Sequence, residues 1–290
     1  MAKRMKKIQI SKSQKITFYI YFAIFLIFCV YCLYPLFWCI CNSLKTPEEY
    51  FNNPTALPES FNLLYYGRIF QSFKVGRYTF WEMAFNSIWQ AGGWQLINVV
   101  ASVMVAYPLA RNNFPLKGFF YGVIIFRITI PVIGAGPATY KFFRTFNMLN
   151  NPLLYSLNYF NGFDMAALIL YGYFKGISKE YSEAAYLDGA TRLQTLVSVV
   201  FPQAFPCILA LYINNVMSSW NIYSVSQLYM TKYPNLAYGL FLFENTATFI
   251  EGSKPMFFGA VIISASVPLL LFIAGQKTML QNMSVGGLKG

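Results

Sequence analysis

The sequence predicts an all-α membrane protein, a bundle of six transmembrane helices with one short helix in a loop between two of them. Of its 290 residues, 57% are hydrophobic and 11% are charged, whereas a soluble domain carries about 25% charged residues. Four runs without any charge, at residues 16–44, 83–110, 193–231 and 255–276, each exceed the roughly 20 residues that a helix needs to cross the hydrocarbon core. These observations argue against a soluble globular protein.

Six spans fit this pattern. They are expected near residues 16–41, 84–108, 118–141, 153–174, 198–221 and 256–276. The first is too long for the core of a signal peptide and should remain as an anchor. The fourth has the weakest pattern, because Asn158, Asn161, Gly162 and Asp164 interrupt its apolar run.

The distribution of charge predicts the orientation. Basic side chains crowd residues 1–15, where no acid occurs, and Lys or Arg beside a first span stays on the cytoplasmic side. An even number of spans returns the carboxyl terminus to the cytoplasm. We therefore expect a multi-pass protein of the plasma or inner membrane with both termini inside. The basic cluster is then a topology signal that can also contact anionic lipid headgroups. Despite the net charge of +12, nucleic-acid binding is not expected.

This orientation assigns the parts of the chain. They are a basic cytoplasmic amino terminus (1–15), a transmembrane domain (16–276) with an outer loop (42–83) and a cytoplasmic loop (175–197), and a Gly-rich cytoplasmic tail (277–290).

Signatures of catalysis are absent from the sequence. It contains no histidine, which removes His-based catalysis and most zinc sites. No Gly-x-x-x-x-Gly-Lys-[Ser/Thr] loop for ATP phosphates occurs. Four of the five cysteines lie in or at the end of the first span among apolar neighbours, as expected of inert thiols. We expect no catalytic, cofactor-binding or metal-ligating residue, and the chain is not expected to be an enzyme.

One polar loop carries a specific motif. Residues 183–202 read EAAYLDGATRLQTLVSVVFP: Glu-Ala-Ala, three residues, Gly, nine residues, a branched apolar residue, one more, then a bulky apolar residue and Pro. This stretch resembles the cytoplasmic coupling loop of permease subunits in binding-protein-dependent ABC importers. Asp188 and Ala190 around the Gly are similar to the carbohydrate branch of that family, and Val199 and Phe201 replace its commoner Ile and Leu.

The residues of this loop also have a physical logic of their own. Glu180 and Glu183 stand in the first turns of a short helix, where negative charge meets the positive end of the helix dipole. Ser178 is the expected N-cap. Gly189 can adopt the left-handed conformation that ends a helix, and Ala184 and Ala185 are small enough for another protein to approach closely. The alternative is an ordinary amphipathic helix at the membrane interface.

Three weaker stretches resemble the same family, in particular the shorter membrane subunit of the maltose transporter. They are Ala106 to Arg111 at the end of the second span, where Pro108 departs from the family's Ala, Pro58 to Leu63 in the outer loop, and the Gly-rich tail 286–290. Together with the coupling loop they extend the resemblance over nearly the whole chain.

The resemblance implies a permease that forms half of the translocation path for a sugar or oligosaccharide, either neutral or acidic. The implied partners are a second permease (as a heterodimer), two ATPase subunits that bind ATP and magnesium, and an extracytoplasmic solute-binding protein. The residues implied in ATPase coupling are Glu180, Glu183, Ala184, Ala185, Leu187, Asp188, Gly189 and Arg192. Two alternatives remain: an importer for an amino acid, peptide or polyamine, and a self-contained secondary transporter.

Charged and polar side chains inside the spans are candidates for the solute path. A charge at the centre of a span costs about 2.5–3.5 kcal/mol on insertion scales, so Arg127 and Asp164 need an explanation. They either pair with each other, or Arg127 reaches one face of the membrane, or Arg127 lines a water-filled cavity. Asn214, Asn215, Trp220 and Asn221 supply amides and an aromatic ring for a sugar, or else hydrogen bonds between packed helices.

Overall fold

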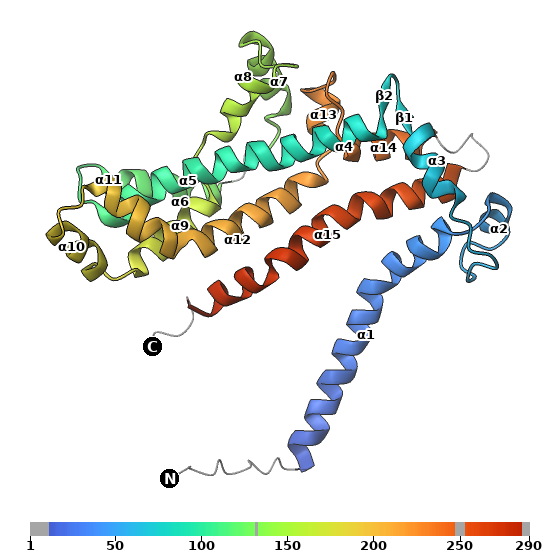
Figure 1. Ribbon diagram of the computed structural model, residues 1–290, viewed down its shortest axis with the longest axis horizontal. Coiled ribbons are helices and arrows are strands. Elements are labelled where there is room, and N and C mark those ends of the chain that lie inside the picture. Colours follow the sequence, from blue (N-terminus) through green and yellow to red (C-terminus); the bar gives the residue numbers. More distant parts are fainter. Residues whose placement is uncertain (1–11, 131–132, 247–252, 286–290) are drawn as a thin grey trace.

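The computed structural model describes residues 12–130, 133–246 and 253–285, and this part of the chain is predominantly helical (Figure 1). The long helical elements are α1 (Lys12–Ser43), α4 (Phe80–Ile88), the π-helical turn η1 (Trp89–Gly93), α5 (Trp94–Arg111), α6 (Lys117–Thr129), α9 (Met165–Gly176), the π-helical turn η3 (Leu196–Val200), α12 (Phe201–Trp220) and α15 (Ser253–Val285). The shorter elements are α2 (Pro47–Asn52), α3 (Leu64–Ser72), β1 (Lys74–Val75), β2 (Tyr78–Thr79), α7 (Gly136–Thr145), α8 (Pro152–Ser156), the 3₁₀ turn η2 (Leu157–Tyr159), α10 (Glu180–Leu187), α11 (Arg192–Thr195), α13 (Ser224–Leu228) and α14 (Leu236–Thr246).

Four of the predicted spans are present as long apolar helices. Lys12–Ser43, Phe80–Arg111, Arg192–Trp220 and Lys254–Met279 are long and apolar enough to cross a membrane. Two of them contain a π-helical turn, η1 at the Gly92–Gly93 pair and η3 just after α11. The all-α membrane class is therefore confirmed.

The third and fourth predicted spans are not single helices, so the count of six is not confirmed. Helix α6 ends at Thr129, before Pro131, and α7 begins only at Gly136. Pro removes a backbone donor and clashes with the preceding turn, and Gly134 has a positive φ of 78°. In the fourth predicted span, α8 and η2 are separated from α9 by residues 160–164, which form no regular secondary structure. With 13 and 12 residues, α6 and α9 reach only about 20 Å each.

The centre of the molecule is formed by helices that run side by side. Helix α5 packs against α9 and α12, and α12 packs against α15 (Figure 1). Val99, Leu170, Phe174 and Ala204 form the buried contact among α5, α9 and α12. A second core lies at the other end of the bundle, where α3, α4, α14 and α15 meet, and contains Phe73, Met83, Phe243 and Ala260 among its buried residues.

The two ends of the bundle differ. Helices α10 and α11 lie at one end, and α2, α3 and the β1–β2 hairpin lie near the other (Figure 1). The hairpin pairs Lys74 with Thr79 and Val75 with Tyr78 in antiparallel register. It forms part of the predicted outer loop 42–83. The cluster at residues 1–11 and the tail at 286–290 lie outside the described residues.

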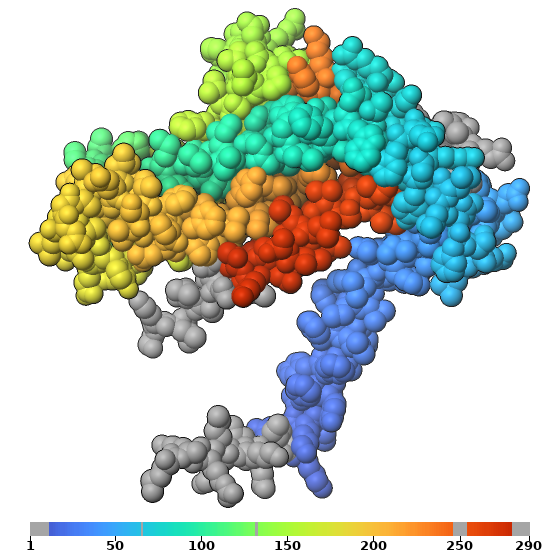
Figure 2. Space-filling view, viewed as in Figure 1, coloured from blue at the N-terminus to red at the C-terminus, as the bar shows by residue number. Residues whose placement is uncertain are grey.

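Helix α1 stands apart from the other helices. The carboxyl end of α1 contacts the amino end of α15. There Trp38 packs edge-on against Phe258, with ring centroids 5.0 Å apart. The buried residues of α1 are confined to Cys41, Asn42 and Ser43. The space-filling view shows the rest of α1 as a separate arm (Figure 2). An apolar helix that is uncovered in this way must be covered by lipid or by another subunit.

Candidate functional site

The structure has two regions to which candidate functional residues belong, the loop around α10 and the broken helices around Asp164. In the first, the Ser178 hydroxyl accepts a hydrogen bond from the Glu180 backbone N–H at 3.3 Å. Lys179 occupies the cap position by backbone geometry, one residue later than predicted, but Ser178 still supplies the bond expected of an N-cap. Glu180 and Glu183 are exposed in the first turn of α10, near the positive end of its dipole.

Helix α10 ends in the conformation predicted for Gly189. Gly189 has a φ of 83°, its N–H donates to the Tyr186 carbonyl at 3.1 Å, and the Ala190 N–H donates to the Ala185 carbonyl at 2.9 Å. This pair of bonds is the Schellman motif, which satisfies the last carbonyls of a helix and requires a left-handed residue. Gly189 therefore redirects the chain at once toward α11.

The next helix is capped as well, by a pattern that our sequence analysis missed. The Thr191 hydroxyl accepts from the Gln194 N–H at 3.3 Å, and the Gln194 side chain accepts from the Thr191 N–H at 2.8 Å. This is a capping box, and its Thr-x-x-Gln signature is visible in the sequence. Arg192 lies exposed inside it. The loop thus consists of two short helices, each closed by hydrogen bonds of its own.

The side chains of α10 divide into two groups. Glu180, Glu183, Ala184, Leu187 and Asp188 are exposed, and Leu187 reaches 89% exposure. Ala185 is half-buried, and α10 packs against α11 and η3. The exposed face of α10 therefore combines acidic side chains with one apolar side chain, Leu187. Ala184, but not Ala185, belongs fully to this face.

In the second region, Arg127 and Asp164 do not pair with each other. The Asp164 carboxylate accepts from the Asn98 amide at 2.9 Å, from the Ser102 hydroxyl at 3.0 Å and from the Ala167 N–H at 3.0 Å. It thereby caps α9 and ties α9 to α5. The Arg127 guanidinium donates to the Asn161 side chain and to the Phe163 carbonyl, the latter at 2.8 Å. The pairing alternative is therefore wrong.

Two pockets adjoin these residues. One, of about 290 Å³, is lined by five amides (Gln95, Asn98, Asn158, Asn161 and Asn215), two serines (Ser218 and Ser219) and Tyr159; we call it the amide pocket. The other, of about 690 Å³, contains Arg127 among mainly apolar side chains such as Phe142 and Leu157; we call it the Arg127 pocket. Asn158 and Asn161 line both pockets, so they form a shared wall.

The predicted residues of α12 separate into different environments. Asn215 lines the amide pocket, and its side chain donates to Asn98 at 3.2 Å. Trp220 is instead a core residue, 5% exposed, with its indole N–H directed at Ser264. Asn214 and Asn221 are exposed and line neither pocket. The structure thus brings Arg127, Asp164 and Asn215 into one region. Trp220 lines a smaller cavity that shares Tyr159 and Ser219 with the amide pocket, whereas Asn214 and Asn221 lie outside this region.

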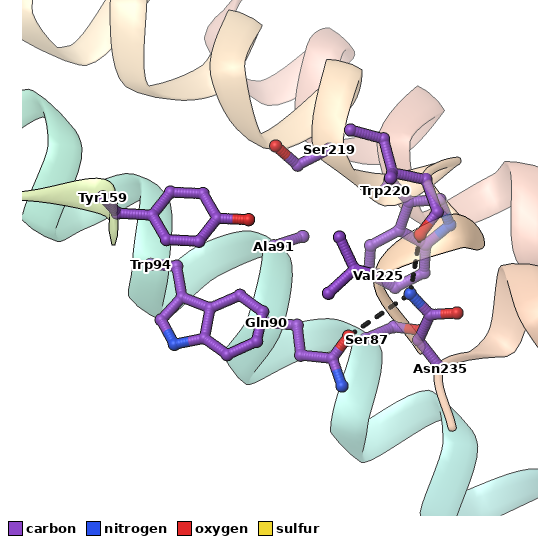
Figure 3. Close-up of a pocket in the computed structure, with 10 residues that line it drawn as sticks. Ser87, Gln90, Ala91, Trp94, Tyr159, Ser219, Trp220, Val225 and Asn235 are labelled. Carbon is purple, nitrogen blue, oxygen red and sulfur yellow. Dashed lines mark hydrogen bonds between the residues drawn. The ribbon is translucent and has the colours of Figure 1, made fainter. Parts of the chain in front are cut away.

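A smaller cavity lies next to the amide pocket (Figure 3). Its volume of about 10 Å³ is about the smallest that can hold one water molecule. Figure 3 shows Tyr159 beside Trp94, and Asn235 donating to the Gln90 side chain, a contact of 3.3 Å. The Trp94 and Tyr159 rings stack with their centroids 5.2 Å apart and 18° between their planes. These two contacts connect η1 and the start of α5 to Asn235 and to Tyr159 in η2.

Four lining residues of the amide pocket were not predicted from the sequence: Gln95, Asn98, Asn158 and Asn161. The available signal was the presence of amides inside otherwise apolar spans, which is costly unless they bond to each other or line a polar cavity. Asn158 and Asn161 were noted only as weakening a span. Their shared position between two pockets depends on the break at residues 160–164.

Comparison with known proteins assigns the chain to a family. It is 25% identical over 260 residues to the sulfoquinovosyl glycerol transport system permease protein of Agrobacterium fabrum, covering 88% of each chain. It is 24% identical over 255 residues to the diacetylchitobiose uptake system permease protein of Streptomyces coelicolor, covering 87% of this chain and 82% of the relative. It is also 28% identical over 214 residues to the maltose/maltodextrin transport system permease protein of Salmonella typhimurium, covering 71% of each.

A solved structure shares the fold. It is a bacterial ABC transporter involved in the import of the acidic polysaccharide alginate, and one of its chains superposes with a TM-score of 0.75, at 22% identity, over 92% of this chain and 98% of that one. Residues 98–277 match the family described as the binding-protein-dependent transport system inner membrane component. This segment contains the capped loop, the helices of the third and fourth predicted spans, α12 and most of α15, and it makes up more than half of the chain. The chain belongs to this family of inner membrane transport components.

Proposed function

We propose that this chain is a permease subunit of an ATP-binding-cassette importer and lines half of the translocation path for a sugar or oligosaccharide. The observation that carries the proposal is the rigid, exposed α10, held at one end of the long helices by α11 and η3. Relatives named for sulfoquinovosyl glycerol, diacetylchitobiose and maltose uptake support a carbohydrate substrate.

The partners follow from this role. ATP and magnesium are bound by two separate ATPase subunits that contact α10, and an extracytoplasmic solute-binding protein delivers the sugar. The chain itself is then a non-catalytic subunit. A second permease, different from this one, supplies the other half of the path, and the uncovered length of α1 supports a neighbour of that kind (Figure 2).

The orientation belongs to the same proposal. Helix α10 faces the cytoplasm together with both termini, and α2 and α3 face outward. With the native cysteines replaced, a cysteine at the exposed Ser178 should react with an impermeant thiol reagent only from the cytoplasmic side. One at the exposed Ser60 should react only from outside. The reverse pattern would contradict both the orientation and the ATPase contact.

The ATPase contact is tested by two substitutions on the exposed face of α10. Glu183→Lys reverses a charge in the first turn, and Ala184→Leu enlarges a side chain that is exposed. Both variants should insert normally, because neither residue lies in a span. Both should lose most ATPase subunits during affinity purification of the co-expressed complex and transport sugar at a small fraction of the wild-type rate. Ala184→Leu would overpack the contact, as an added side chain overpacks a core, and Glu183→Lys would put a positive charge at the positive end of the α10 dipole.

Asn113→Lys is the matched control. Asn113 is exposed in the loop between α5 and α6, and the variant adds a positive charge outside α10. It should retain the ATPase and transport normally. Wild-type ATPase retention and transport in both α10 variants would show that α10 is not the ATPase contact, and the importer proposal would then lose its main support.

A further inference from the structure

We infer that the amide pocket is a subsite for one sugar unit and that Arg127, across the shared wall, binds an anionic group, a carboxylate or sulfonate, on the same solute. This inference rests on the proposed function and narrows it to acidic saccharides. It assigns a role to the two charges that lie among the apolar segments, Arg127 and Asp164, and the two roles differ.

The amide pocket lies at the depth of the middle of a long helix. Gln95 and Asn98 lie near the middle of the long helix Phe80–Arg111, and Asp164 bonds to Asn98 and Ser102. The irregular residues 160–164 therefore lie beside the centre of a span. Irregular backbone at membrane depth is tolerated only where protein buries it or where it lines a polar cavity. Asn161, within that stretch, lines both pockets.

The lining of the amide pocket matches the chemistry of a sugar. Amides and hydroxyls offer both donors and acceptors to a ring of hydroxyl groups, and the pocket contains no charged side chain among its lining residues. Within the described part of the chain, the Asn158 side chain makes no hydrogen bond, although it faces both pockets. The Tyr159 ring, stacked on Trp94, adds an aromatic surface of the kind that binding sites for polar small molecules often contain.

The amides are held in place by internal bonds. Asp164 accepts from the Asn98 amide, and the Asn98 carbonyl oxygen accepts from Asn215, so one carboxylate orients two lining residues from different helices. The Gln95 amide donates to the Ser219 hydroxyl in the same pocket. Side chains fixed before binding lose little entropy when a ligand arrives. Asp164 is therefore a positioning residue that does not line the amide pocket itself.

Arg127 is available for an anion. Its two hydrogen bonds use one terminal nitrogen, Nη1, which leaves N–H groups on the other two guanidinium nitrogens. Asp164 is engaged elsewhere, and no ion pair joins Arg127 to an acidic side chain in the described residues. Its guanidinium geometry suits bidentate contact with a planar carboxylate or with two oxygens of a sulfonate. Arg127 bonds to Asn161, which lines both pockets. An anion bound by Arg127 would therefore lie next to the amide pocket.

The test measures binding to the detergent-purified permease pair, this chain with its second permease, by equilibrium dialysis. The probes are cellobiose and its uronate, in which one C6 hydroxymethyl group is replaced by a carboxylate. Wild type should bind the uronate roughly tenfold more tightly than cellobiose, a difference worth one good charged contact. Arg127→Gln should remove this preference and leave cellobiose binding within about twofold. Asn158→Ala should weaken both probes equally.

Two further variants keep the result interpretable. Arg127→Lys retains a positive charge without the fork and should keep part of the preference, so a folding defect in Arg127→Gln would still leave the inference testable. Arg144→Gln removes an exposed Arg on α7 that lines neither pocket and should bind as wild type does.

The outcomes separate the two proposals. If the wild-type pair binds cellobiose but shows no uronate preference, or if Arg127→Gln keeps the tenfold preference, the anion subsite is wrong and sugar transport still stands. If Asn158→Ala leaves both affinities unchanged, the amide pocket is not the sugar subsite. If the wild-type pair binds neither probe and the complete transporter imports no saccharide, the proposed function itself fails.

Discussion

The loop around α10 and the amide pocket are built in opposite ways. In the loop, the bonds that define the structure join residues two to five positions apart, as in Ser178 with Glu180 and Ala185 with Ala190. In the amide pocket they join residues 66 and 117 positions apart, Asn98 with Asp164 and Asn98 with Asn215. The loop's side chains are mostly exposed, whereas Gln95, Asn98 and Ser102 are buried.

This difference separates two kinds of mutational effect. A local, exposed element can lose a contact with a partner while the rest of the protein stays folded. A pocket assembled from distant segments shares its bonds with the packing of the bundle, so a change there alters both stability and binding. The predictions below test this contrast, beginning with the largest expected effect.

Asp164→Ala should be the most damaging single change. It leaves the Asn98 amide and the Ala167 N–H without their shared acceptor, while the Ser102 hydroxyl keeps the Asn98 carbonyl as a partner. Each buried group that loses its partner costs about 1–3 kcal/mol, and the loss includes the cap of α9. We expect a fall of about 3 kcal/mol or more in the free energy of unfolding, measured by thermal denaturation in detergent, together with loss of sugar binding.

The control for Asp164 is Asn214→Ala, which removes an exposed amide on α12 outside both pockets. It should change neither stability nor binding. Normal stability in Asp164→Ala would mean that the long-range bonds do not hold the bundle together, and the contrast with the loop would disappear.

Gly162→Ala should come next, by moving the broken segment away from α5. A Cβ at Gly162 would overlap the Ala101 carbonyl oxygen and lie 2.6 Å from Val105 Cγ2. Overpacking of this kind costs about 1–3 kcal/mol. The displacement would also move Asn161, and with it the wall that the amide pocket and the Arg127 pocket share. Both the thermal midpoint and sugar affinity should fall. Gly172→Ala on α9 is the matched control, since nothing lies within 4 Å of its added methyl group; equal behaviour of the two variants would exclude a tight contact at Gly162.

Gly189→Ala should have the smallest effect on the protein alone and a clear effect on coupling. Its φ of 83° costs a residue with a Cβ about 1–2 kcal/mol, and that cost falls on the turn between α10 and α11. Global stability should change little, while sugar-stimulated ATP hydrolysis by the assembled transporter should drop several-fold. Gly189→Asn should be milder because Asn tolerates this conformation.

The corresponding control is Gly176→Ala, at the end of α9. Nothing lies within 4 Å of the methyl group that this substitution adds, and the φ of Gly176 is not in the left-handed region. Gly176→Ala should leave ATP hydrolysis unchanged. A Gly189→Ala variant with wild-type coupling would show that the Schellman turn is not needed to present α10.

Much of the fold could be predicted because its signals are local or compositional. Four long apolar helices follow from uncharged runs such as 16–44, and the end of α10 follows from the single residue Gly189. The capping box of Thr191 and Gln194 was equally readable from its spacing and was missed. The third and fourth spans were predicted as continuous because hydropathy averages over Pro131 and over residues 160–164. In the structure α6 ends at Thr129, and residues 160–164 are not helical.

The sequence by itself determined that this chain crosses a membrane, that a polar loop carries a short helix ended by Gly189, and that a few charges lie among apolar segments. Each follows from residue type and spacing alone. Only the tertiary structure decided what those charges do: Asp164 bonds to Asn98 and Ser102, and Arg127 to Asn161 and Phe163. The reason is physical. A buried polar group takes whichever partner the packing of helices places within about 3 Å, and helices far apart in sequence supply those partners.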